Sequence, residues 1–180
     1  MIVRRTYEFH APIDTVTESL MERFVQDPTV MLNTPDLKGC RMLERRDNGD
    51  TVALTVQYSA YSQIPKMVQH LLTPEMLTWI SRGLWNRPKR TYSFDVETAY
   101  FTKQVSCRGA QQFVAAGNDK TLQKMEMKLR ISIPLFGPFV EKEIARLFVA
   151  NLDAGYQIAR KIVEDGLLPD RLPMPGASGA

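Results

Sequence analysis

Residues 131–163 have the sequence ISIPLFGPFVEKEIARLFVANLDAGYQIARKIV, in which a strand ends, the chain breaks and a long helix follows. Pro134 and the pair Gly137-Pro138 interrupt the strand, and a helix is predicted from about 138 to 164. At 1.5 Å per residue this helix is roughly 40 Å long, enough to cross a whole curved sheet. Its predicted buried stripe consists of Val140, Ile144, Leu147, Phe148, Asn151, Leu152, Gly155, Ile158, Ala159 and Ile162.

The strand that precedes this helix has the clearest alternation in the chain. Apolar residues occupy every second position, and charged or polar residues lie between them, which is typical of a strand with one buried and one solvated face. The apolar set is Met125, Met127, Leu129, Ile131 and Ile133, and the polar set is Lys124, Glu126, Lys128, Arg130 and Ser132.

The rest of the chain predicts an antiparallel sheet. Residues 2–9 alternate as a half-buried strand, and Pro12 suits the first turn of an amphipathic helix over 12–25. Asn48-Gly49 is a strong hairpin signal because both residues tolerate a positive φ. The remaining predicted elements are strands at 38–46, 52–58, 76–84, 91–97, 100–107 and 110–116, with a short helix or a lid at 64–72.

Composition indicates a single globular domain. The 180 residues are 44% hydrophobic and 24% charged, which excludes a disordered or collagen-like chain. We expect one domain over 1–166 and a flexible Pro/Gly-rich tail over 167–180. A net charge of +3 does not indicate nucleic-acid binding.

The sequence lacks the patterns of a metal site and of a membrane-spanning or signal segment. Cys40 and Cys107 lack the spacing of a zinc site or a disulfide framework, so neither a metal nor another cofactor is expected. The sequence contains neither a membrane-spanning apolar run nor a signal-peptide pattern. The expected location is therefore the cytoplasm, with the option of peripheral contact with a membrane.

The order of elements resembles the START-like superfamily, also called SRPBCC, whose type fold is that of the birch-pollen allergen. The resemblance covers about residues 1–165, and its most specific part is residues 131–163, which resemble an uncharacterised bacterial family. The layout is similar, more distantly, to the PRELI-type phospholipid-transfer proteins. The resemblance implies an α+β helix-grip fold, in which a curved antiparallel sheet of six or seven strands wraps around one long C-terminal helix. It also implies a cavity for a hydrophobic small molecule or lipid.

The predicted cavity wall combines the apolar strand faces with the stripe of the long helix. Any single one of these residues is more often plain core than a ligand contact, so the prediction concerns the set. The set is Val56, Tyr58, Phe94, Phe101, Val105, Phe113, Met125, Met127, Leu129, Ile131, Ile144, Leu147, Phe148 and Leu152.

A second candidate surface lies between Glu75 and Asp95, where no acidic residue occurs. Basic residues beside tryptophan suit an anionic membrane surface or a phosphate headgroup. The alternative, which we favour, is a solvated hairpin whose Trp side chains belong to the core. The candidate contacts are Trp85, Arg87, Lys89 and Arg90.

Three functions remain open at the level of sequence. The first is binding, and with it transport, of a hydrophobic small molecule or lipid. The second is an aromatase/cyclase-type enzyme, which needs an acid or base inside the cavity, whereas the expected interior is almost wholly apolar. The third is a protein-interaction module that uses an apolar groove. No catalytic residue is assigned, because His10, His70, Asp95, Glu97 and Tyr100 have no spacing that implies a shared site.

Overall fold

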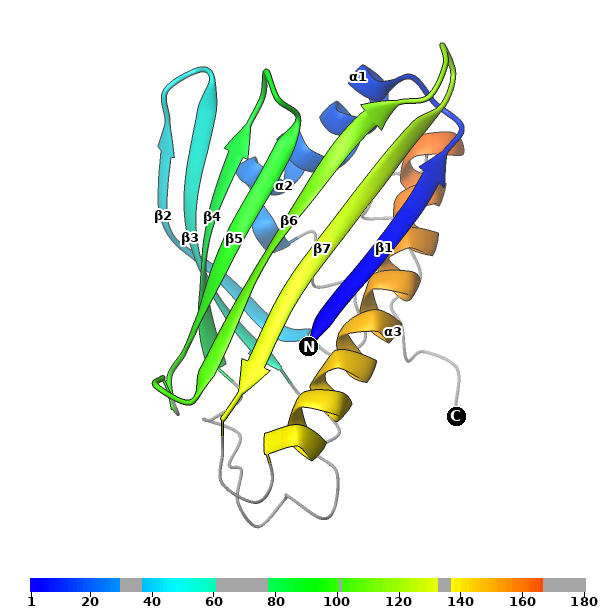
Figure 1. The fold of residues 1–180 in the computed structure, drawn as a ribbon. Helices are drawn as coiled ribbons and strands as arrows, with labels where there is room; N and C mark the ends of the chain where they lie inside the picture. The colour runs from blue at the N-terminus through cyan, green and yellow to red at the C-terminus, as the bar shows by residue number, and fades with distance from the viewer. Residues whose placement is uncertain (30–36, 61–77, 101, 133–136, 167–180) are drawn as a thin grey trace, which may run out of the picture.

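The computed structural model describes residues 1–29, 37–60, 78–100, 102–132 and 137–166. Its core is one antiparallel sheet of seven strands in the order β1-β7-β6-β5-β4-β3-β2 (Figure 1). The strands are β1 (Ile2–Phe9), β2 (Leu37–Asp47), β3 (Thr51–Ala60), β4 (Thr78–Asn86), β5 (Thr91–Thr98), β6 (Val105–Ala115) and β7 (Thr121–Ile131).

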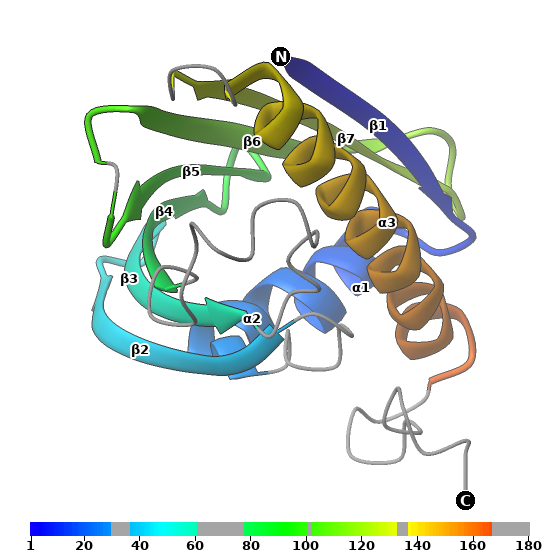
Figure 2. The ribbon, with the colours of Figure 1, turned by 90° about the horizontal axis from the view of Figure 1, so that it is seen from below.

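One long helix, α3 (Gly137–Glu164), lies along the concave side of this sheet. Figure 2 shows the sheet curving around the interior, with α3 next to β1 and β7. The α+β helix-grip architecture expected from the sequence is confirmed.

A short helical segment follows β1 and packs beside the sheet. It consists of α1 (Ile13–Thr17), a π-helical turn η1 (Glu18–Glu22) and α2 (Arg23–Gln26). The helix predicted over 12–25 is therefore present, but a π turn interrupts it. The Thr17 hydroxyl donates to the carbonyl of Ile13 at 2.9 Å just before this turn, and such back-bonding competes with the helical pattern.

One strand prediction is wrong. Strands were expected at 100–107 and 110–116, whereas the structure has the single strand β6. Gly109 resembles a break in the sequence, but it stays in register between Phe94 and Met127. Glycine is needed here because the Phe94 ring occupies the space that a side chain at residue 109 would fill. The predicted helix at 64–72 and the predicted tail at 167–180 lie outside the described residues.

The buried apolar residues form two separate clusters. The larger one joins the N-terminal helical segment to β1 and to the middle of the sheet, with Phe9, Val16 and Trp85 among its members. The smaller one lies against the N-terminal half of α3, and its members are Val3, Met127, Leu129, Ile131 and Ala145. The interior therefore contains two cores, and both lie on the inner face of the same sheet.

Candidate functional site

The strand register places the predicted strand residues on one face of the sheet. Val105 lies opposite Ile131, and Phe94 lies in line with Gly109 and Met127. The alternation confirms the same inner face for Val56, Tyr58, Phe113, Met125 and Leu129. Phe101 and the side chain of Leu147 lie outside what the structure describes.

Helix α3 differs from its predicted stripe by about one position. Ala145 is 5% exposed and packs in the smaller core, whereas Ile144 is 40% exposed. Phe148 and Leu152 pack against the two cores as expected. Ile144 is thus a residue of the outer surface and not of the interior wall, because the small Ala145 is the side chain that faces the sheet.

Two glycines shape the middle of the inner face. A Cβ placed on Gly83 would lie 2.0 Å from the Tyr92 hydroxyl oxygen, and a Cβ on Gly109 would lie 2.5 Å from Cζ of Phe94. Both rings come from β5, and each therefore lies flat over a glycine of a neighbouring strand. Flat rings project less into the interior, so these glycines leave space above the centre of the sheet.

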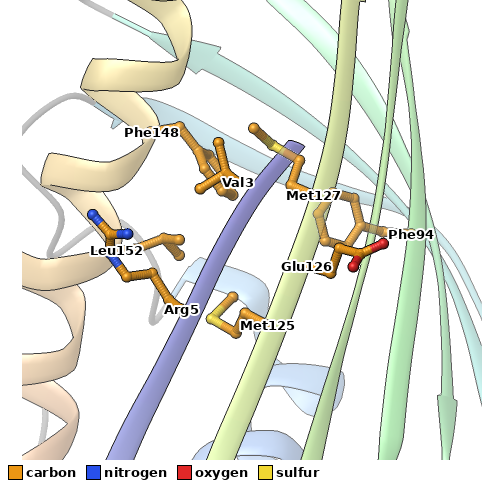
Figure 3. A pocket seen from close by; sticks show the side chains of 8 residues that line it. All are labelled: Val3, Arg5, Phe94, Met125, Glu126, Met127, Phe148 and Leu152. Atoms are coloured by element: carbon orange, nitrogen blue, oxygen red, sulfur yellow. The ribbon is translucent and has the colours of Figure 1, made fainter. Parts of the chain in front are cut away.

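A small pocket lies between α3 and the β1–β7 side of the sheet. Figure 3 shows Phe148 and Leu152 of α3 directed toward β1 and β7. The volume is about 10 Å³, roughly the room that one water needs. Its lining residues are Val3, Arg5, Phe94, Met125, Glu126, Met127, Phe148 and Leu152.

The side chains between the two cores are only half-buried, although they face inward. Phe94, Met125 and Leu152 pack against the larger core, and Val105 and Phe148 pack against the smaller one, without full burial in either. We call these five residues the inner apolar strip. An apolar strip on a concave face that is not fully covered is the usual lining of a small-molecule site.

Polar groups on the same inner face were missed by the sequence reasoning. Ser81 is 8% exposed and Tyr92 is 7% exposed, and burial raises the pKa of Tyr92 to about 12. Gln111 donates to Met21, and Gln123 donates to Gln111. The alternation along each strand could have identified them, because residues an even number of positions apart lie on the same face. Ser81 therefore shares the face of Trp85, and Tyr92 shares the face of Phe94.

Polar contacts attach α3 to β1. The Tyr7 hydroxyl donates to Asp153 at 2.6 Å, and Arg5 pairs with the same carboxylate at 3.4 Å. The rings of Tyr7 and Tyr156 stack with centroids 4.5 Å apart, and the Tyr156 hydroxyl donates to the carbonyl of Glu8. These contacts fix the C-terminal half of α3 over the edge of the sheet.

The basic and aromatic turn between β4 and β5 is tied into the protein. Trp85 is 1% exposed, and its indole N–H donates to Glu22 at 2.8 Å, which agrees with the core alternative. Arg87 donates to both oxygens of Glu22 and to Asp47, and Arg90 pairs with Asp14. Lys89 stays exposed. The Trp85 indole is thus not available to a membrane surface.

The described part of the chain contains no group of three His, Cys, Asp or Glu side chains placed to hold a metal. No helix within it has both the length and the apolar composition needed to cross a membrane.

The sequence matches the model of one protein family over residues 4–163. That family is described as "Protein of unknown function (DUF2505)". No curated protein matches this chain.

Solved structures share the fold at low identity. A START superfamily protein from Mycobacterium smegmatis is 20% identical, with a TM-score of 0.56 over 92% of this chain and 99% of that chain. A norcoclaurine synthase from Thalictrum flavum, in complex with dopamine and hydroxybenzaldehyde, is 14% identical, with a TM-score of 0.66 over 93% and 88%. The Zhui aromatase/cyclase from a Streptomyces species is 17% identical, with a TM-score of 0.60 over 91% and 95%. These likenesses confirm the START-like fold.

Proposed function

We propose that this chain, which belongs to the family described as "Protein of unknown function (DUF2505)", binds a hydrophobic small molecule on the concave face of its sheet. The observation that carries the proposal is the half-buried inner apolar strip between two separate cores. Covering such a strip with an apolar ligand removes more of its area from water, at about 25 cal/mol per Å². The START-like fold supports the same class of ligand, since one structural neighbour is in complex with small aromatic molecules.

The chemistry of the inner face favours binding over acid–base catalysis. Burial raises the pKa of Tyr92 to about 12, and it raises the pKa of Cys107 to about 11. A general base works best when its pKa lies near the operating pH, and these groups stay protonated there. Tyr92 and Cys107 are therefore hydrogen-bond donors and not bases, and we propose a binding protein before an aromatase/cyclase-type enzyme.

Contact with an anionic membrane at the β4–β5 turn is not part of this proposal. Trp85 is buried, and the carboxylates of Glu22 and Asp47 already neutralise Arg87. A lipid remains one member of the proposed ligand class.

Native mass spectrometry of the purified protein, followed by organic extraction, tests the proposal. The expected result is a released lipid or hydrophobic metabolite, or saturable uptake of the dye Nile red. Met125→Trp is expected to reduce uptake because the larger ring fills the inner strip. Lys124→Trp, on the opposite face of the same strand, is the matched control and leaves uptake unchanged. A folded protein with neither bound ligand nor dye uptake would refute the proposal.

A further inference from the structure

Four polar-tipped side chains form one row across the inner face, near one end of the sheet. Cys40 lies directly opposite Tyr58, Tyr58 opposite Trp79, and Trp79 opposite Thr98. Directly opposed residues have Cβ atoms about 4.5–5.5 Å apart, so the four side chains are neighbours along a single line. We call this line the polar row. It brings a thiol, a phenol, an indole N–H and a hydroxyl together from β2, β3, β4 and β5.

Thr98 is the member of the row whose side chain lacks a hydrogen-bond partner among the described residues. Its hydroxyl oxygen is buried, and no partner for it exists among the residues that the structure describes. A buried hydroxyl without a hydrogen bond costs free energy, and in native proteins such a group calls for an explanation. A ligand atom that accepts its proton supplies one.

The row offers a flat aromatic surface next to this hydroxyl. The rings of Tyr58 and Trp79 are stacked, with centroids 5.7 Å apart and planes 24° apart. Tyr92 and Phe94 form a second stacked pair, with centroids 6.1 Å apart. Stacked aromatic side chains favour a planar ligand that continues the stack.

The row is neutral as well as polar. Burial raises the pKa of Cys40 to about 11, and burial followed by the neighbouring Tyr92 and Cys40 raises the pKa of Tyr58 above its usual range. Arg82 and Glu97, on β4 and β5, pair with each other on the opposite face, and the negative charge of Asp27 raises the pKa of Cys40 further. A neutral donor set suits an uncharged acceptor and offers no counter-ion to an anion.

We propose that the polar row is the polar end of the ligand site and selects a planar aromatic molecule with a neutral hydrogen-bond acceptor, such as a ketone or aldehyde carbonyl. Thr98 donates to the carbonyl oxygen, and the Tyr58–Trp79 stack supports the ring. This inference rests on the proposed binding function, and it adds the chemical class of the ligand.

Two matched probes separate the two proposals. Isothermal titration calorimetry compares 2-acetylnaphthalene with 2-ethylnaphthalene, which lacks only the carbonyl oxygen. The wild-type protein is expected to bind the ketone about tenfold more tightly, because one hydrogen bond distinguishes the probes. Thr98→Val keeps the shape and removes the donor, so it abolishes this preference and leaves the Kd of 2-ethylnaphthalene unchanged. Thr91→Val, on the opposite face of the same strand, keeps the preference.

Each remaining outcome has a definite meaning. Equal wild-type affinities for both probes, or an equal loss of both in Thr98→Val, overturn the inference and leave the proposed function intact. Binding of neither probe, together with failure of Nile red uptake, overturns both. Thr98→Val without ligand is expected to melt no lower than wild type, since it removes a buried hydroxyl without a partner. Should it fail to fold, Thr98→Ala replaces it, because it also removes the donor, with the same expected loss of preference.

Discussion

Replacing Gly83 by alanine is expected to destabilise the protein. At most strand positions the same replacement stabilises a protein, because it reduces the freedom of the unfolded chain. A Cβ at this position would lie 2.0 Å from the hydroxyl oxygen of Tyr92 and 2.5 Å from its Cζ. The ring has little freedom to move away, because Tyr92 is 7% exposed and packs edge-on against Phe24 at 5.5 Å. The extra methyl group therefore forces a shift inside a packed core.

The expected size of the effect comes from two opposing terms. Overpacking a core costs about 1–3 kcal/mol. Replacing a glycine reduces the freedom of the unfolded chain and returns about 0.4–1 kcal/mol, so the net loss lies between about 0 and 2.6 kcal/mol, with a midpoint of about 1.3 kcal/mol. For a chain of this length the midpoint lowers the Tm by about 3–5 °C. Gly39→Ala is the matched control, because its new Cβ meets nothing closer than the Cβ of Ser59 at 3.8 Å, and it is expected to gain about 0.4–1 kcal/mol.

Urea unfolding followed by far-ultraviolet circular dichroism measures these free energies, with unchanged m-values as the check on two-state behaviour. Tyr92→Phe in the Gly83→Ala background removes the closest clashing atom. The double variant is expected to be more stable than the sum of the two single effects implies. A Gly83→Ala protein as stable as Gly39→Ala, or strict additivity with Tyr92→Phe, would refute the reasoning.

Three other changes have defined outcomes. The Arg87 guanidinium holds the pKa values of Glu22 and Asp47 below their usual ranges, so its stabilisation is present at neutral pH and is lost as the pH falls below about 5. Arg87→Leu is expected to lower the urea midpoint at pH 7 and to flatten its decline between about pH 5 and pH 2. Tyr7→Phe removes a hydroxyl that donates to a carboxylate and is expected to cost about 1–2 kcal/mol in urea unfolding, whereas Tyr100→Phe, at a residue 45% exposed, changes nothing measurable. Both cysteines have pKa values raised to about 11 by burial, so their reaction with an aromatic disulfide reagent is expected to accelerate about tenfold per pH unit from pH 7 to pH 9; a rate independent of pH contradicts this.

Strand alternation was the most informative signal in the sequence. It placed Met125 and Leu129 on the inner face, because a period of two follows from the pleat and needs no tertiary information. The same rule failed at β6, since Gly109 resembles a turn residue and its role depends on Phe94 of the next strand. A glycine that makes room for a ring cannot be told from a glycine that ends a strand until the register is known.

The phase of α3 was harder to predict for a similar reason. Apolar residues occur on more than one side of this helix, and hydrophobicity alone favoured Ile144 over Ala145. The structure instead directs the small residue toward the sheet, where a short side chain permits close approach. Trp85 shows a different limit. Its place in the core was the favoured prediction, but its hydrogen-bond partner Glu22 lies 63 residues earlier in the chain and comes near only in the folded protein.

The two ends of the inner face differ in a way that bears on function. At the end closed by the N-terminal helical segment, Glu22 binds both Trp85 and Arg87, so polar requirements there are met within the protein. At the polar row, by contrast, the Thr98 hydroxyl has no partner among the described residues. Valine would fill the same volume without the cost of desolvation, so the Thr98 hydroxyl costs stability that plain core packing does not require. The ligand that we propose, which is apolar and accepts one hydrogen bond, would give this hydroxyl the partner that the described residues do not provide.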